Sequence, residues 1–145
     1  MKILLGVENS KFSGSAWRAI IAQFRPETTE VRVLHVLQPV VAVAPPEMAK
    51  GYVPEIDDQK KPAHELVARI AEELHQAGFK VDTAVKIGDV RVGIIDCATQ
   101  WGADLIVVGS HGQGGIPSFL LGSVAEFVAR HARCSVEIVR SPAKA

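Results

Sequence analysis

Five short apolar or β-branched segments alternate along this chain with stretches of helical periodicity. Residues 2–7 (KILLGV) and 105–108 (LIVV) are continuous apolar runs, which are typical of strands covered by helices on both faces. Residues 31–37 (VRVLHVL) and 81–87 (VDTAVKI) are rich in β-branched side chains, and residues 135–140 (SVEIVR) form a similar segment near the end. We therefore expect a β-strand at each of these positions.

Helical periodicity fills the intervals between the expected strands. Apolar residues recur at helical spacing in the first two intervals: Phe12, Ala16, Ala19, Ile20 and Phe24, then Leu66, Ile70, Leu74 and Ala77. Pro26 ends the first helix and Gly78 follows the second, as helix C-termini favour. Asp89 is placed to cap a third, short helix, and residues 120–130 give the fourth.

One segment breaks this rhythm. Residues 38–58 contain Pro39, Pro45, Pro46 and Pro54, with Gly51 among them, and show no sustained period. We expect a long loop here, and loops of such length are often functional.

The order of the elements predicts the fold class. Strands that alternate with helices are typical of a parallel sheet built from right-handed crossovers. We expect a single α/β domain over residues 1–145, with a doubly wound five-stranded parallel sheet in the order 3-2-1-4-5. In that order strand 1 lies beside strand 4, so the ligand crevice should lie above the carboxyl ends of these two strands.

Composition narrows the classes of partner. The 145 residues are 48% apolar, enough for one sizeable core, and 16 basic residues balance 16 acidic ones. Without net charge, a nucleic acid or an anionic membrane is not an expected partner. Cys97 and Cys134 lie in apolar stretches, which favours reduced thiols. The chain has no signal-like start and no run of membrane-spanning length, so we expect a soluble cytoplasmic protein.

A glycine-rich segment follows the fourth strand and carries the candidate chemistry. Residues 109–115 read GSHGQGG, and Gly122 and Ser123 follow at the next helix. Glycine lets the backbone approach a ligand closely, so its N–H groups can converge on anionic oxygens. The helix adds its own free N–H groups, and the Ser123 hydroxyl could contact a phosphate or a phosphate-bound Mg²⁺. The glycine pattern alone is equally compatible with a structural role, in which the glycines only make a flexible turn and a close helix contact.

Two familiar phosphate motifs are excluded. The segment lacks GxxxxGK[ST], with no lysine between Gly109 and Ser123, so it is not a Walker A loop. It also follows strand 4 rather than strand 1, which excludes the dinucleotide fingerprint.

The segment resembles the universal stress protein family, whose nucleotide-binding members carry G-x2-G-x9-G-[ST] at this point. The matching residues are Gly109, Gly112, Gly122 and Ser123. The resemblance extends along the chain through His35-Val36 at the end of strand 2, Gly88-Asp89 before the third helix, and the run DLIVVGSHG. It implies the adenine nucleotide alpha hydrolase-like fold and binding of ATP with Mg²⁺.

The resemblance also implies roles for individual residues. Phosphate or ribose contacts fall to Gly109, Gly112, Gly122, Ser123 and the backbone of Val124, with Val108 beside the base and Val36 near the adenine. The family's usual aspartate after strand 1, which holds a ribose hydroxyl, is Glu8 in this chain. The additional methylene moves the carboxylate by more than a hydrogen bond tolerates without backbone adjustment.

The glycine-rich loop also differs in charge from the same loop of many family members. Many of them carry lysine or arginine late in the loop, whereas Gln113, Ile116, Pro117 and Ser118 are uncharged, so phosphate binding would depend on backbone amides. Arg91 could supply charge, or it could be a solvated surface residue.

A homodimer through residues 135–140 is a further implication of the resemblance. Val136, Ile138 and Val139 would form the seam of an edge strand, whereas Glu137 and Arg140 could instead protect the edge of a monomer. We favour the dimer.

Three functions are compatible with the sequence. The leading one is a regulatory protein of the stress response that binds ATP. The second is a weak ATPase using His111 or Glu8, for which the sequence supplies little charge stabilisation. The third is a dimeric interaction module without nucleotide. We assign no catalytic residue and no metal ligand, because His35, His64, His75 and His131 lack metal-ligand spacing.

Overall fold

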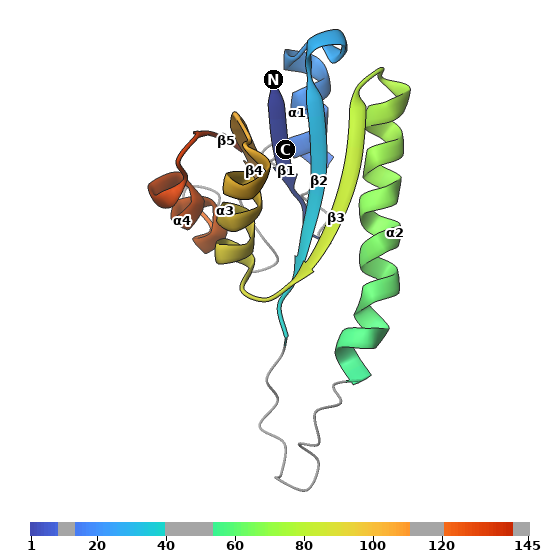
Figure 1. The fold of residues 1–145 in the computed structure, drawn as a ribbon, viewed down its shortest axis with the longest axis vertical. Helices are drawn as coiled ribbons and strands as arrows, with labels where there is room; N and C mark the ends of the chain where they lie inside the picture. The colour runs from blue at the N-terminus through green and yellow to red at the C-terminus, as the bar shows by residue number, and fades with distance from the viewer. Residues whose placement is uncertain (9–13, 40–53, 111–120, 141–145) are drawn as a thin grey trace, which may run out of the picture.

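The centre of the molecule is a parallel sheet of five strands (Figure 1). The computed structural model describes residues 1–8, 14–39, 54–110 and 121–140. The strand order is β3-β2-β1-β4-β5, so the predicted α/β class and the predicted order are both confirmed. β1 lies between β2 and β4, and the winding of the chain reverses at the boundary between β1 and β4.

The elements follow the predicted alternation closely. The strands are β1 (Lys2–Gly6), β2 (Glu30–Leu37), β3 (Lys80–Ile87), β4 (Leu105–Gly109) and β5 (Ser135–Val139). The helices are α1 (Gly14–Gln23), α2 (Pro54–Gln76), α3 (Val90–Trp101) and α4 (Ser123–His131), and a short 3-10 turn, η1 (Pro26–Thr28), follows α1. Within the described residues, no helix combines the length and the apolar character needed to cross a membrane.

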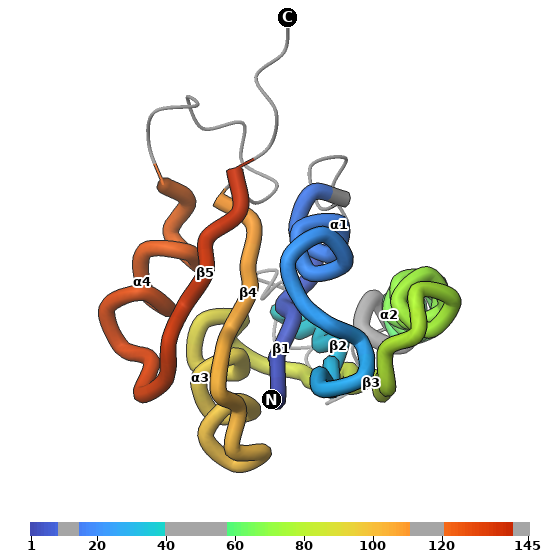
Figure 2. The backbone as a smooth tube through the Cα atoms, turned by 90° about the horizontal axis from the view of Figure 1, so that it is seen from above, coloured from blue at the N-terminus to red at the C-terminus, as the bar shows by residue number. Residues whose placement is uncertain are grey.

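Helices cover both faces of the sheet. Figure 2 shows α1 and α2 on one side and α3 and α4 on the other. Successive residues of β1 alternate between the two layers: Ile3 and Leu5 pack with α1 and α2, whereas Leu4 packs with α3 and α4. All three side chains are 0% exposed, which explains why β1 is a continuous apolar run in the sequence.

The loop expected over residues 38–58 does not extend to residue 58. α2 begins at Pro54, so the last part of that segment is the first turn of a helix. Proline is compatible with a first turn because the N–H it lacks would have no intrahelical partner there. Proline content alone therefore misplaced the boundary, and residues 40–53 lie outside the described residues.

The last helix begins later than predicted. The sequence suggested residues 120–130, but α4 starts at Ser123 and Gly122 is its N-cap, with an extended backbone (φ −64°, ψ 157°). Leu121 lies before the helix. Apolar periodicity extended the prediction across Leu120 and Leu121 because it does not report backbone conformation. Gly122 and Ser123 therefore lie at the start of α4 rather than inside it.

Two glycines let α3 approach the sheet closely near the carboxyl ends of its strands. A Cβ on Gly93 would lie 3.0 Å from Cγ2 of Val36 on β2. A Cβ on Gly6 would lie 3.2 Å from Cγ1 of Val108 and 3.3 Å from Cδ1 of Ile94. The helix therefore packs directly over the region where β1, β2 and β4 end.

This packing makes Gly93→Ala informative. Alanine improves helix propensity by about 1 kcal/mol, but overpacking against Val36 costs about 1–3 kcal/mol, so we expect a net loss of unfolding free energy. In a Val36→Ala background, which removes the contacting atoms, the same change should be neutral or stabilising. Denaturant unfolding of the four proteins measures both effects. An equal cost of Gly93→Ala in the two backgrounds would contradict the close approach.

Candidate functional site

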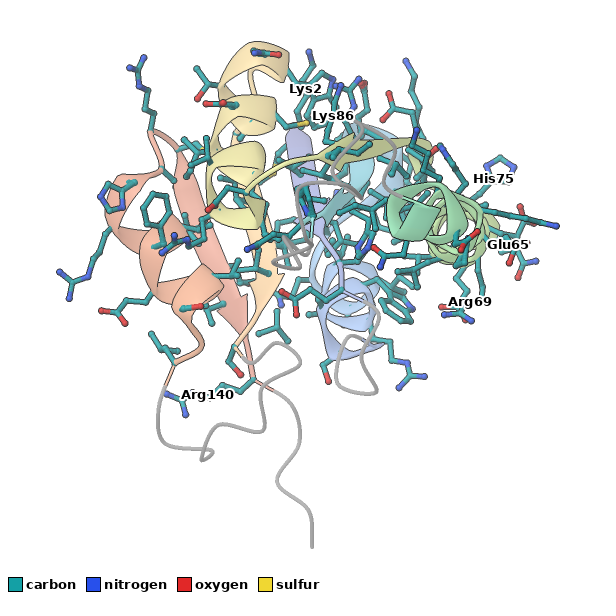
Figure 3. All side chains as sticks on the ribbon, turned by 90° about the horizontal axis from the view of Figure 1, so that it is seen from below. Lys2, Glu65, Arg69, His75, Lys86 and Arg140 are labelled. Atoms are coloured by element: carbon teal, nitrogen blue, oxygen red, sulfur yellow. The ribbon has the colours of Figure 1, made fainter. Side chains whose placement is uncertain are left out.

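A cleft of about 770 Å³ lies at the carboxyl ends of β1, β2 and β4. Its walls are the N-terminal turns of α3 and α4 together with part of α2, and Figure 3 views the molecule from this end. The volume is in the range of pockets that enclose small organic ligands. The cleft lies at the predicted position, where the winding reverses between β1 and β4.

Every predicted site residue that the structure describes lines this cleft. These residues are Glu8, Val36, Val108, Gly109, Gly122, Ser123 and Val124. They come from four separate parts of the chain and meet only in the folded molecule. Gly112 and His111 lie outside the described residues.

The backbone of Ser110 fixes the start of α4 beside the end of β4. Its N–H donates to the carbonyl of Val139 at 2.8 Å, and its carbonyl accepts from the N–H of Gly122 at 2.7 Å. Ser110 is 1% exposed, so water does not compete for these bonds. The two ends of the glycine-rich segment are therefore held together by one hydrogen bond.

The N-terminus of α4 has backbone donors directed at the cleft. The first helical hydrogen bond runs from the N–H of Glu126 to the carbonyl of Gly122 at 3.0 Å, so the N–H groups of residues 123–125 have no intrahelical acceptor. Gly122 provides no side-chain cap. Ser123, Val124 and Ala125 all line the cleft. This helix end offers several donors and the positive end of a helix dipole to an anion.

The N-terminus of α3 is chemically different, although it borders the same cleft. The Asp89 carboxylate accepts from the N–H of Arg91 at 2.9 Å and from that of Val92 at 3.2 Å, so the predicted cap is confirmed. The bond from the Val92 N–H, followed by that from the Arg91 side chain, lowers the pKa of Asp89 below its ordinary value. An anion therefore meets free donors at α4 and a carboxylate at α3.

The wall between these helix ends is apolar. Val36 and Val108 are 6% and 3% exposed and belong to the core layer beneath α3 and α4. Ile94 and Leu34 complete this surface within the same layer. A flat, weakly polar group could pack against it without leaving a buried polar atom unpaired.

The carboxyl end of β1 contributes polar groups. Val7 extends the pairing with β2 through its N–H, which donates to the carbonyl of Leu34 at 2.9 Å, and this places the half-buried Glu8 at the cleft. His35 also lines the cleft, and its Nδ1 is 2.7 Å from the carbonyl of Val7. Since a carbonyl only accepts, Nδ1 carries the proton.

Other lining residues were not identified as site residues from the sequence. His35 lacks metal-ligand spacing, so the sequence gives it no role beyond its place at the end of β2. Asp58, Pro62 and Ala63 of α2 reach the cleft through the packing of α2, which no local motif reports. Among the described residues, no three His, Cys, Asp or Glu side chains form a group that could hold a metal ion.

Comparison with known proteins identifies the family. The model of the universal stress protein family matches residues 1–140. The chain belongs to the universal stress protein family. It is 30% identical to the universal stress protein YxiE of Bacillus subtilis over 145 residues, which cover 96% of this chain and 98% of that protein. The solved structure of the universal stress protein UspA from Lactobacillus plantarum matches with a TM-score of 0.84 at 22% identity, with 97% of each chain covered.

Several related structures contain adenine nucleotides. A universal stress protein family protein from Arabidopsis thaliana, solved with AMP bound, matches with a TM-score of 0.71 at 22% identity and covers 99% of this chain and 93% of that one. Two other members are complexes with cAMP and, in Archaeoglobus fulgidus, with dAMP. At these identities the comparison establishes the common fold.

The Asp89 cap gives stability a pH dependence with a definite sign. Because the folded-state pKa is lowered, the stabilisation is complete above the ordinary aspartate pKa and is lost as the pH falls through the lowered value. Asp89→Asn keeps the cap without the charge, so the stability difference between the wild type and this variant should shrink on acidification. Asp89→Ala should be less stable than both at neutral pH. Thermal unfolding between neutral and strongly acidic pH measures this, and a difference that does not change with pH contradicts the assignment.

Proposed function

We propose that this protein binds an adenine nucleotide, ATP with Mg²⁺, in the cleft and acts as a regulatory protein in the cytoplasm. The observation that carries the proposal is the uncapped N-terminus of α4, whose free amides line the same cleft as an apolar wall. One end of the cleft suits phosphate oxygens and the wall suits a purine ring. The adenine nucleotides bound to related structures support this class of ligand.

Each predicted residue receives a role in this arrangement. The phosphates would lie against the backbone of Gly109, Gly122, Ser123 and Val124, which line the cleft, and the family motif assigns the same role to Gly112, outside the described residues. The adenine would pack on Val36 and Val108, and the Glu8 carboxylate would accept a hydrogen bond from a ribose hydroxyl after the backbone adjustment that its additional methylene requires. The amides of α4 would orient the phosphate oxygens, and Mg²⁺ bound with the nucleotide would supply screening of the phosphate charge.

Ligand binding would regulate the protein through its stability. A ligand that binds only the folded state raises the free energy of unfolding, by ~2.7 kcal/mol at a concentration about 100 times the Kd. The cleft joins β1, β2 and β4 with the starts of α3 and α4, so bound nucleotide would stabilise the contact between these elements.

Two substitutions at Gly122 test the phosphate site. Gly122→Asp places a carboxylate at the N-cap, where it accepts from the free amides of α4 and repels phosphate. We expect it to lower Mg-ATP affinity at least roughly tenfold, since a charged hydrogen-bonded contact is lost. The stability of the ligand-free variant should be equal or slightly higher, because aspartate caps helices better than glycine.

Gly122→Ala is the matched control, because it adds the same Cβ without the carboxylate. Titration calorimetry with Mg-ATP and thermal unfolding without ligand separate binding from stability. If Gly122→Asp binds ATP as tightly as Gly122→Ala, the phosphates do not lie at this helix end. Mass spectrometry of the natively purified wild type would also detect a nucleotide that remains bound.

We also propose that the protein is a homodimer formed through β5. This strand ends at Val139, one residue before the predicted end, and among the described residues its outer edge has no pairing strand. Val136, Ile138 and Val139 are half-buried, and Glu137 already accepts a hydrogen bond from Gln23 within the chain at 3.3 Å. An apolar edge strand of this kind favours pairing with a second copy.

Light scattering coupled to size-exclusion chromatography tests the dimer. We expect twice the mass of one chain across a range of protein concentrations. The mass of a single chain throughout that range would contradict pairing through β5.

A further inference from the structure

Arg91 contacts both the N-cap residue of its own helix, α3, and an aromatic side chain of α4. It lies in the first turn of α3 and lines the cleft. Its guanidinium carbon is 5.1 Å from the centre of the Phe127 ring on α4, and its Nη2 is 3.5 Å from Oδ2 of Asp89. The cation is therefore positioned by an aromatic ring on one helix and by a carboxylate on the other.

The geometry of α4 brings this cation to the free amides. Phe127 follows Ser123 by one helical turn, so the two side chains share a face with their Cβ atoms about 5–6 Å apart. Side chains on a helix incline toward its N-terminus, so the Phe127 ring inclines toward the turn that begins at Ser123, and it also stacks on the ring of His131, with centroids 4.1 Å apart. A guanidinium held on that ring lies beside the helix end where we place the phosphates.

The described lining of the cleft has more carboxylates than basic side chains, so an anionic ligand depends on the Arg91 cation. Among its described lining residues, Glu8, Asp58 and Asp89 are carboxylates, and Arg91 is the single arginine or lysine. Residues 109–123 contain neither lysine nor arginine. The helix end contributes the equivalent of about half a positive charge, which does not balance a phosphate group. Arg91 supplies a full charge at that point.

The guanidinium remains available for a ligand. Its contact with Asp89 is one long hydrogen bond between side chains that are 46% and 40% exposed, so exchanging it for another acceptor costs little. Within the part of the chain that the structure describes, this is the hydrogen bond that its side chain makes, and the other N–H donors of the fork have no acceptor there. The planar group can stack on Phe127 and donate two parallel bonds to phosphate oxygens at the same time.

We infer that Arg91, positioned by Phe127, is the cationic contact for the phosphates of the bound nucleotide and makes the cleft prefer phosphorylated adenine ligands over adenosine. This inference rests on the proposed function. The charge that related proteins are expected to carry in the glycine-rich loop is then carried by α3. Arg91 is a specificity-determining residue, and Phe127 is a positioning residue.

The test compares adenosine, AMP and Mg-ATP as ligands of the full chain by titration calorimetry. Arg91→Gln should lower the affinity for Mg-ATP and AMP roughly 10- to 100-fold, the effect of losing a charged hydrogen bond. Its affinity for adenosine should stay within about twofold of the wild type, as for independent sites. Arg91→Lys should lie between the two, because it keeps the charge without the planar stacking.

Two further variants separate a positioning role from a structural one. Phe127→Leu keeps the Arg91 charge but removes the ring, so it should weaken Mg-ATP binding less than Arg91→Gln and leave adenosine binding unchanged. Arg130→Gln is the matched control: Arg130 lies on the same helix, is paired with Glu126 at 3.1 Å and does not line the cleft. It should bind all three ligands like the wild type.

The outcomes distinguish this inference from the proposed function. A wild type that binds none of the three ligands overturns the proposed function and this inference with it. A wild type that binds Mg-ATP, with an Arg91→Gln variant that keeps the same ratio of Mg-ATP to adenosine affinity, overturns the role of Arg91 alone. An equal loss for Arg130→Gln would also overturn it, because the effect would then follow from net charge.

Discussion

The backbone of Ser110 holds the site together. Its N–H is bonded to Val139 of β5 and its carbonyl to the N–H of Gly122, and both bonds are shielded from water. β4 thereby ends where α4 begins, although the two are separated by the whole glycine-rich segment. If these bonds were lost, the free amides of α4 would no longer face the apolar wall of Val36 and Val108.

Two helices begin at this cleft, and the residue before each one decides what it can attract. At α3 that residue is Asp89, whose carboxylate accepts hydrogen bonds from amides in the first turn of the helix. At α4 it is Gly122, which has no side chain to do so. The same backbone geometry thus gives one neutralised end and one open end. Different parts of the cleft therefore suit different groups: the open helix end suits anionic oxygens, and the wall suits an apolar ring.

The strands of the sheet were predicted well because each one is marked by the residue types within its own segment. β1 is apolar from Ile3 to Leu5 and β4 from Leu105 to Val108, as is typical of strands covered on both faces, and the alternation of strands with helices predicted the order of the sheet. The helix starts were predicted less well. Pro54 resembled a loop marker although it opens α2, and Leu121 extended the periodicity of α4 beyond its true start.

The sequence indicated the residues of the cleft where a motif contains them and missed those that tertiary packing brings there. Gly109, Gly122 and Ser123, which the family motif predicts as phosphate contacts, line the cleft. The cleft position of His35 depends on a bond to the carbonyl of Val7, and the position of Arg91 depends on the ring of Phe127. Both contacts join elements distant in the sequence, so no pattern within one helix or strand could indicate them.

A bound anion should perturb the backbone amides that receive it, and amide chemical shifts measure this directly. In a ¹⁵N-labelled sample titrated with Mg-ATP, we expect the largest perturbations at the amides of Ser123, Val124 and Ala125. The amide of Val92, which already donates to Asp89, should change far less, whereas the amide of Arg91 also responds to its side chain exchanging Asp89 for phosphate. Saturation with nucleotide that perturbs the start of α3 and leaves the start of α4 unchanged would contradict the central claim.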